Sequence, residues 1–379
     1  MVNVSLLWLL LVPVFLSVAL FFILRSGIAN PPVKQYRYGR VGALTSNHPP
    51  PITFAAISLL IGVIITAITF ASGVGFKTHD YEVLNGQVTG KSREEVHCRH
   101  SYSCNCRKVC SGSGKDKSCR EECDTCYEHS YDVDWIAHTT LGGIYIDTID
   151  RRGIEQPPRW TAVTPGQPAS KVSSYTNYIK AVPESVMHFA SNDLKAKFVG
   201  KVPAYPLNIY DYHYIDRVIP VGVNVPDIKR WNLEIGGMLR TLGPSKQVNV
   251  VIIPTNITDK DYIYAVRDAW LGGKKNDVVI IASITDYPKI NWVHVMSWSD
   301  RELFKVQLRD ELQGGDFTVE RVIPIIEKNI AKTFERKRMR EFEYLENEID
   351  PPDWLLWTGV VLNILVCGGM IILYRKGGW

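Results

Sequence analysis

QVNVVIIPTNITDKDYIYAVRDAWLGGKKNDVVIIASI, residues 247–284, decides the fold of this chain. Its first part, 248–253, is mostly apolar and β-branched, which predicts a buried strand. Apolar side chains at a spacing of four then predict a helix over 259–270, and two glycines end it. A second apolar run, 277–284, predicts another buried strand. A unit of this length favours parallel strands with the helix on one face of their sheet.

This stretch resembles the TPM domain family, which comprises membrane-tethered α/β domains that usually face away from the cytoplasm. The resemblance is carried by GGKKND at 272–277 and the strand after it, and it covers about 205–345. After Ile284 the chain departs from the family pattern, because TDYPKINWVHVMSWSDREL replaces a strand and glycine-rich turn. The resemblance implies a TPM-like three-layer α/β sandwich and a role in the assembly, repair or regulation of membrane complexes.

Further elements complete the α/β domain expected over 205–345. A helix is predicted over 224–242, because Asn and an early Pro are ordinary start signals. Alternation predicts a strand over 292–298, and two more helices are expected over 300–312 and 317–345. The charged end of the last helix, FERKRMREFEYLE, is either a solvated surface or a contact for anionic lipid headgroups.

Three apolar runs predict transmembrane helices, at 1–25, 52–72 and 354–374. Each is long enough to cross a hydrocarbon core of about 30 Å at about 1.5 Å per residue. A cleavable signal peptide is the alternative for the first run. That run lacks a basic start, and Arg25 follows it where small residues would be expected. We therefore expect an integral membrane protein with three spans.

Basic residues predict how these spans are oriented. The short loop over 26–51 carries three basic residues and no acid, and the tail after the third span is basic as well. The positive-inside rule places both segments in the cytoplasm. The large body over 76–353 is then extracytoplasmic, as in a periplasm. Six basic residues before the third span argue the other way, but long loops translocate largely regardless of charge.

Seven of the eight cysteines lie between Cys98 and Cys126. This segment cannot bury enough apolar surface to fold alone, so it needs metal ions or disulfides. Thiolate and imidazole suit tetrahedral zinc, and seven cysteines with one histidine would hold two structural zinc ions. His100 is the second choice for the histidine. The predicted ligands are Cys98, Cys104, Cys106, Cys110, Cys119, Cys123, Cys126 and His129.

Disulfides are an equal alternative, expected if the body faces an oxidising compartment. Three bridges would leave one of the seven thiols over. A redox-active Cys123-x2-Cys126 pair is the third option, but it does not open a helix after a strand as a thioredoxin-type site does. The choice between zinc and disulfides stays open at this point. Cys367 lies in the third span, where a cysteine acts as a small apolar residue.

The cysteines belong to a β-rich module expected over 76–200. Alternation predicts a hairpin over 81–90 that turns at Asn85-Gly86, and short strands over 131–135 and 143–147. Four acids in this module are either a calcium set or the solvent-exposed face of these strands. They are Asp132, Asp134, Asp147 and Asp150.

The sequence shows no nucleophile elbow, no His-Glu-x-x-His and no phosphate loop. A net charge of +4 is slight and predicts no nucleic-acid partner. We expect a non-enzymatic protein that is anchored in the lipid bilayer and presents both modules to another membrane protein or complex. One alternative is a cytoplasm-facing zinc module that recruits a partner. The other is a hydrolase of phosphate esters with acids at Asp259, Asp261, Asp268 and Asp286.

Overall fold

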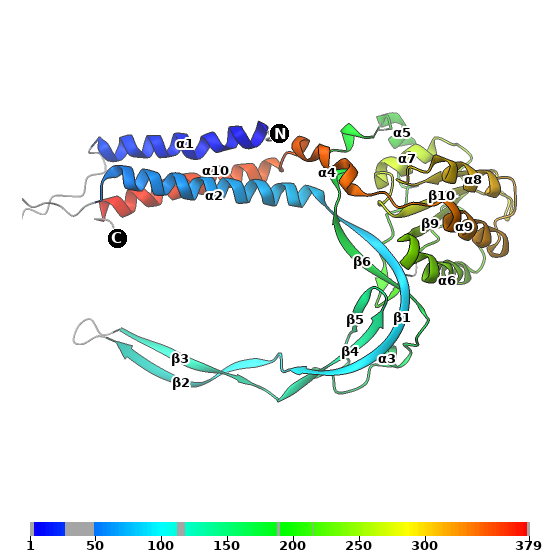
Figure 1. Cartoon of the computed structure of the whole chain (residues 1–379), viewed down its shortest axis with the longest axis horizontal. Coiled ribbons are helices and arrows are strands. Elements are labelled where there is room, and N and C mark those ends of the chain that lie inside the picture. Colours follow the sequence, from blue (N-terminus) through cyan, green and yellow to red (C-terminus); the bar gives the residue numbers. More distant parts are fainter. Residues whose placement is uncertain (1–3, 27–48, 112–117, 188–189, 215, 377–379) are drawn as a thin grey trace, which may run out of the picture. The chain divides into compact units, whose positions relative to one another are not determined.

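The computed structural model describes residues 4–26, 49–111, 118–187, 190–214 and 216–376. The chain divides into two compact units (Figure 1). Unit 1 comprises Met1–Asp80, Ser174–His188 and Arg338–Trp379, and unit 2 comprises Tyr81–Ser173 and Phe189–Lys337. The modules predicted over 76–200 and 205–345 therefore both contribute to unit 2, and each also gives a short segment to unit 1.

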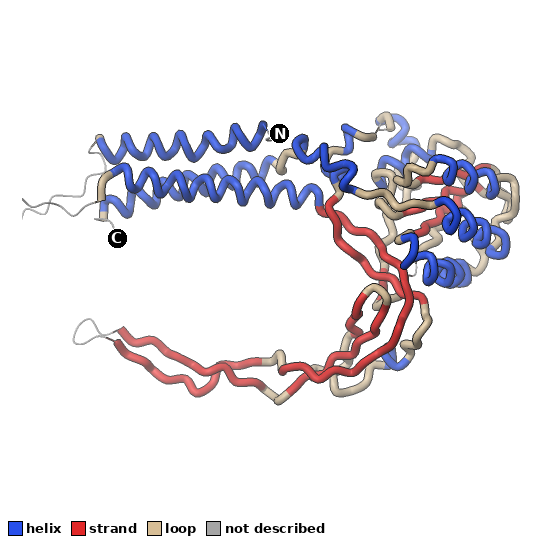
Figure 2. The backbone as a smooth tube through the Cα atoms, viewed as in Figure 1, coloured by secondary structure: helices blue, strands red, loops and turns tan. Residues whose placement is uncertain are grey.

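Unit 1 contains three helices that are long and apolar enough to cross a membrane: α1 (Val4–Arg25), α2 (Pro51–Thr78) and α10 (Asp353–Arg375). They correspond to the three predicted spans, with α2 longer at its C-terminal end. The three helices pack along one another (Figure 2). Gly62 allows a close approach, because a Cβ there would lie 2.4 Å from Asn363 Oδ1 and 2.7 Å from Pro13 Cβ. Asn363 donates to Thr66 and to the Gly359 carbonyl, which satisfies its buried amide.

Unit 2 is built on a three-stranded sheet of order β11-β10-β9. β9 (Asn249–Thr255) and β10 (Asp277–Ser283) are parallel, as predicted, and β11 (Trp292–Met296) pairs antiparallel with β10. Every residue of β9 and β10 is buried, because helices cover both faces of the sheet. The strands consequently consist largely of uninterrupted apolar residues, which is the pattern that identified them.

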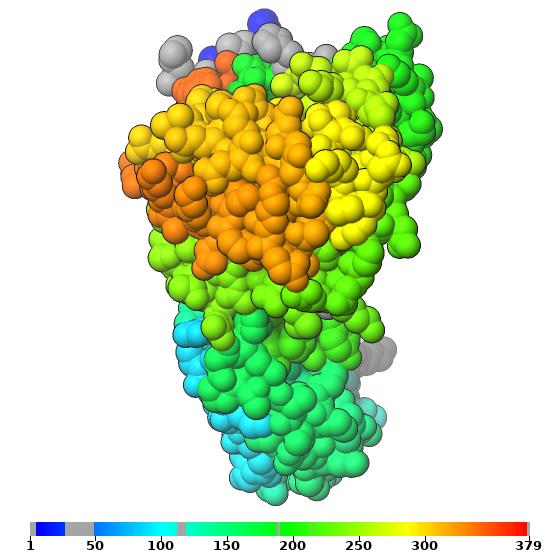
Figure 3. All heavy atoms as spheres, turned by 90° about the vertical axis from the view of Figure 1, so that its right-hand side faces the viewer, coloured from blue at the N-terminus to red at the C-terminus, as the bar shows by residue number. Residues whose placement is uncertain are grey.

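Three helices cover one face of this sheet, and α7 (Tyr262–Trp270) packs on the other. α6 (Ile228–Lys246), α8 (Glu302–Leu312) and α9 (Val319–Thr333) pack with Val250, Ile252, Val278 and Ile280 in one core cluster. α7 packs on Val251, Ile253, Val279 and Ile281 in another. Successive strand residues thus point into different cores. The arrangement has three layers, and side chains of α8 and α9 form a continuous outer surface (Figure 3).

The helix predicted over 317–345 is wrong in its second half. α9 ends at Thr333, and Phe334 adopts an extended conformation and is buried against Phe304 at a ring distance of 5.5 Å. Arg336 then pairs with Glu82, and Lys337 with Asp300. A short 3-10 helix, η3 (Met339–Glu348), follows in unit 1. The helical periodicity is present, but these tertiary contacts lie at residues 334–337, which form no helix.

A second sheet of unit 2 has the order β5-β4-β1-β6. Its strands are β1 (His79–His97), β4 (Tyr131–Thr139), β5 (Gly142–Ile146) and β6 (Pro168–Thr176), and the first and last of them continue into unit 1. The strands predicted over 131–135 and 143–147 are confirmed as β4 and β5. Smaller elements are α3 (Pro158–Thr161), α4 (Tyr178–Ala181), η2 (Pro183–Ser185), α5 (Asn192–Lys197), β7 (Ile209–Tyr210) and β8 (His213–Tyr214).

The hairpin predicted at Asn85-Gly86 is wrong, since β1 runs straight through these residues. The Asn85 side chain is buried and donates to the Val248 carbonyl at 2.9 Å. Gly86 lies against Thr140, where a Cβ would be 2.1 Å from the hydroxyl oxygen. Asn-Gly favours a turn when the segment is considered alone. Here both residues serve close packing between elements distant in sequence, which keeps the strand extended.

A buried polar network joins the two sheets of unit 2. Arg217 is 2% exposed and donates to Asn249 Oδ1 at 2.9 Å, Asn85 Oδ1 at 2.6 Å and Ser170 Oγ at 2.8 Å. Asn249 in turn donates to Asp277 Oδ1 at 3.0 Å. Burial lowers the pKa of Arg217 to about 10 and raises the pKa of Asp277. The network thus connects a buried cation with a buried carboxyl group through one asparagine.

Candidate functional site

The cysteine-rich segment forms a two-stranded antiparallel ribbon, β2 (Ser101–Ser111) with β3 (Ser118–Tyr127) (Figures 1 and 2). Three disulfides cross it: Cys104–Cys126, Cys106–Cys123 and Cys110–Cys119. Most side chains on both strands are exposed, and none of the described ribbon residues belongs to a hydrophobic core cluster. The bridges therefore take the place of a core in holding the strands together.

The structure favours the disulfide alternative over the two-zinc alternative. Six of the eight predicted zinc ligands are sulfur atoms bonded in pairs, so they offer no thiolates. The cluster of Cys106, Glu121 and Cys123 has ligand spacing, but both of its sulfur atoms are in one bridge. The predicted redox pair is also not formed, because Cys123 and Cys126 are bonded to different partners. The unpaired thiol of the segment is Cys98.

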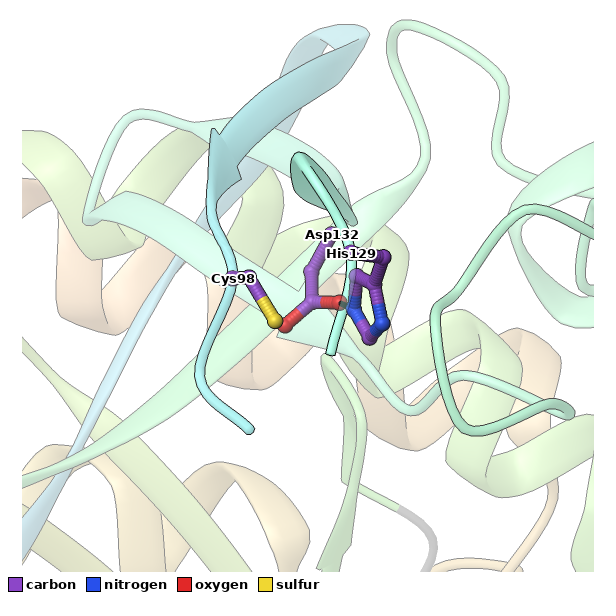
Figure 4. Close-up of side chains that lie close together, drawn as sticks. All are labelled: Cys98, His129 and Asp132. Carbon is purple, nitrogen blue, oxygen red and sulfur yellow. Dashed lines mark hydrogen bonds and ion pairs between the residues drawn. The ribbon is translucent and has the colours of Figure 1, made fainter. Parts of the chain in front are cut away.

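The two remaining predicted ligands, Cys98 and His129, lie together at the foot of the ribbon (Figure 4). Cys98 directly follows β1, and His129 lies in the turn between β3 and β4. Asp132 of β4 is the third member of the cluster. Cys98 Sγ, a ring nitrogen of His129 and a carboxylate oxygen of Asp132 all lie within 4.8 Å of one another. The pairing of β1 with β4, which sets Val96 opposite Asp132, brings the three residues together.

The cluster is buried and organised by the backbone. Cys98 is 2% exposed and Asp132 is 4% exposed. Asp132 accepts hydrogen bonds from His129 and, at 2.8 Å, from the backbone N–H of Arg99. Burial acts to raise the pKa of Asp132, but these hydrogen bonds hold that pKa below its ordinary value. The carboxylate is therefore ionised at neutral pH.

The calcium set predicted from four acids is not assembled. Asp132 and Asp134 are buried, so the alternative of a solvent-exposed face is wrong for these two. Asp134 pairs with the Arg99 guanidinium. Asp150 accepts from the backbone N–H groups of Arg152 and Glu155, which shapes a local turn. Asp147 pairs with Arg159 at 3.4 Å. Sequence reasoning thus identified Asp132 but connected it with the wrong neighbours.

A cleft of about 620 Å³ on the α/β part of unit 2 is the other candidate. Its lining is mixed: it includes the basic residues Lys260 and Arg309, the rings of Trp292 and His294, and the acid Asp310. None of the four acids proposed for a hydrolase lines it. Three of the four have other contacts: Asp259 and Asp261 lie near Lys197, and Asp268 accepts from the backbone N–H of Ala190. The structure therefore does not bring these acids together at this cleft.

His294→Gln should make unit 2 less sensitive to acid. Burial, together with the nearby cations Arg267, Arg309 and Lys305, lowers the pKa of His294 to about 4. Between about pH 6.5 and pH 4 this histidine is protonated in the unfolded chain but neutral in the folded protein. Its contribution to the free energy of unfolding is therefore fully present above pH 6.5 and is lost as the pH falls towards 4. When the pH is lowered from 7 to 5, the free energy of unfolding of the variant should fall by about 1–2 kcal/mol less than that of the wild type.

The measurement for His294 is pulse proteolysis of the full chain in detergent across a urea series at each pH. His97→Gln is the matched control, because His97 is an exposed histidine of unit 2. The control should follow the wild-type pH dependence. If His294→Gln also followed it, the histidine would not be a source of acid sensitivity.

Comparisons of the chain with protein-family models, with curated proteins and with solved structures find no match. The three-layer arrangement of unit 2 is thus an observation, whereas membership of the TPM family stays a prediction. The features of the molecule that bear on function are the ribbon, the Cys98 cluster and the apolar helices.

Proposed function

We propose that the protein is a non-enzymatic membrane protein that presents the disulfide ribbon to another membrane protein or complex. The observation that supports this proposal is that the ribbon is held by several disulfides although it has no hydrophobic core. Three disulfides are concentrated in 27 residues, Ser101–Tyr127, none of whose described residues joins a core cluster. The disulfides make the ribbon rigid but do not contribute to the packing of unit 2. We therefore infer that they serve to hold the exposed surface of the ribbon in one conformation. A preorganised surface lowers the entropic cost of binding.

The chemistry of the ribbon fits a protein partner better than a nucleic acid. Its described residues carry as many acids as bases: Arg107, Lys108, Arg120, Glu121, Glu122 and Asp124. Opposite charges pair across and along the strands, as in Arg107–Glu122 and Arg120–Glu122. Tyr102 is 53% exposed and Tyr127 is 44% exposed. Tyrosine and arginine are enriched in protein interfaces, and the balanced charge gives little attraction for a polyanion.

Three apolar helices anchor the chain and three disulfides fit an oxidising compartment. We therefore propose that the body over 76–353 is extracytoplasmic, in agreement with the basic residues of the short loop. A cytoplasm-facing zinc module would need the thiolates that the bridges consume. The resemblance to TPM domains, which implies work on membrane complexes, supports the same reading.

Site-specific photocrosslinking in intact cells tests this function. A photoreactive residue at Tyr102, on the ribbon, should give a discrete adduct with a membrane protein. The same probe at Tyr145, an exposed tyrosine of β5, is the matched control and should not give that adduct. Cys106→Ser with Cys123→Ser should abolish the Tyr102 adduct, because the ribbon loses its central bridge. Equal adducts from both probe sites, or an adduct indifferent to the bridge, would refute presentation by the ribbon.

A further inference from the structure

We propose that Cys98, His129 and Asp132 together bind one Zn²⁺ ion at the foot of the ribbon. This site is distinct from the two-zinc set expected from the sequence, since it uses one cysteine and adds an aspartate. The proposed zinc site does not depend on the proposed binding partner, because its ligands lie outside the ribbon strands β2 and β3 and are largely buried.

The distances between the three donor atoms suit a single ion. Each atom lies within 4.8 Å of the other two. Zinc bonds of about 2.0–2.3 Å in tetrahedral geometry set neighbouring ligand atoms roughly 3.5 Å apart. The His129 ring and the Asp132 carboxylate, which are hydrogen-bonded to each other, would separate slightly to admit an ion between them and Cys98. Sulfur, imidazole nitrogen and carboxylate oxygen are the three donor types that zinc accepts in proteins.

The atoms behind the ligands are arranged as in a metal site. Two successive backbone N–H groups after Cys98 donate to two of the proposed ligands. That of Arg99 donates to Asp132 Oδ2 at 2.8 Å, and that of His100 donates to Cys98 Sγ at 3.4 Å. Hydrogen bonds of this kind orient ligands and favour their charged forms.

A second imidazole lies beside the cluster. The ring of His100 is 5.7 Å from that of His129, measured between centroids. Its Nε2 lies 3.2 Å from the Arg151 carbonyl oxygen. A histidine that donates one N–H to a carbonyl keeps its other nitrogen for a metal. His100 is not one of the three residues whose donor atoms lie within 4.8 Å of one another, so we assign the fourth position of a tetrahedral ion to water.

The same residues do not form a nucleophilic triad. In Figure 4 the Asp132 carboxylate lies between the Cys98 sulfur and the His129 ring. A catalytic cysteine needs the imidazole as its immediate neighbour, with the acid behind the ring. Here the acid separates the two, which excludes the order that activates a thiol. A simple His–Asp pair beside an inert thiol is the remaining competitor, and it predicts no metal.

Metal analysis of the full chain in detergent tests the proposal. Protein purified without reductant and equilibrated with Zn²⁺ should retain one ion per chain after removal of free metal. Co²⁺ should replace it and give a sulfur-to-cobalt charge-transfer band in the near ultraviolet. Cys98→Ser should abolish the band, and His129→Gln or Asp132→Asn should weaken binding at least tenfold.

Cys367→Ser is the matched control, because Cys367 is the other free cysteine and lies in α10. It should keep both the ion and the band. Intact masses must show all three disulfides in every variant, so that loss of metal is not loss of the ribbon. Absence of bound zinc in wild type, or an unchanged cobalt band in Cys98→Ser, would overturn the site. A failed crosslink at Tyr102 would leave it standing.

Discussion

Arg217→Met should lower the free energy of unfolding of unit 2 by about 3 kcal/mol, a large effect for one substitution. Arg217 is fully enclosed where β1 and β6 of one sheet meet β9 and β10 of the other. Methionine keeps much of the aliphatic volume but removes the cation and its donors. The acceptors of Asn85 and Asn249 then lose a charged partner in a place that water does not reach.

The loss extends to Asp277, which has no direct contact with Arg217. The side-chain amide of Asn249 accepts a hydrogen bond from the Arg217 guanidinium and donates one to the Asp277 carboxyl group, so it links the two groups. The hydrogen bond from Asn249 opposes the effect of burial on the pKa of Asp277, and without the cation Asn249 loses the partner that orients it toward this carboxyl group. Arg217→Met combined with Asp277→Asn should therefore cost less than the sum of the two single changes.

Pulse proteolysis in urea on the full chain in detergent measures these effects. Arg230→Met is the control, because Arg230 is an exposed arginine of α6 whose partner, Glu320, is also exposed. It should change the free energy of unfolding by less than about 1 kcal/mol. If Arg217→Met were as mild as this control, the network would not be what holds the two sheets together.

The parts of the fold set by local pattern were predictable. β9 and β10 are short apolar runs with clear ends, and α7 has a single apolar stripe, so their sequence alone identifies them. Asn85 shows where this fails. Its turn propensity is overridden by bonds to Val248, Ser170 and Arg217, which lie far along the chain. No local pattern records such contacts.

The candidate site was predictable in part for the same reason. The number and close spacing of the cysteines indicate disulfides or metal ions. Which cysteines pair depends on the register of the two strands, which cannot be derived from the sequence alone. Cys98 and His129 were among the predicted ligands. Asp132 was considered only for a calcium set with other acids, because only the pairing of β1 with β4 brings it to Cys98.

Loss of the central bridge, through Cys106→Ser with Cys123→Ser, should loosen the ribbon and leave the core of unit 2 intact. The three bridges are nested and join residues separated by 22, 17 and 9 positions. A bridge that closes a loop of this size is worth about 3 kcal/mol. Since no described ribbon residue joins a core cluster, little else opposes opening. Amide exchange in β2 and β3 should quicken on the order of 100-fold.

Hydrogen exchange on the full chain measures both halves of this prediction. Amides of β9 and β10 should keep their wild-type protection, because their cores are separate from the ribbon. Cys367→Ser, which removes a thiol that forms no disulfide, should change neither region. Equal loosening of β9 and β10 would mean that the ribbon supports unit 2, which contradicts its assignment to surface presentation.

Reduction of all three disulfides tests whether the cysteine-rich segment could instead fold around zinc ions. With reductant and a chelator, β2 and β3 should lose protection completely, since nothing replaces the three bridges. Zinc added to the reduced chain offers the freed thiolates a second way to close the segment. Protection that returned with two zinc ions per chain would show that the segment folds equally well around metal. We expect no such return, because the register that sets Cys110 opposite Cys119 suits bridges between strands rather than tetrahedral sites.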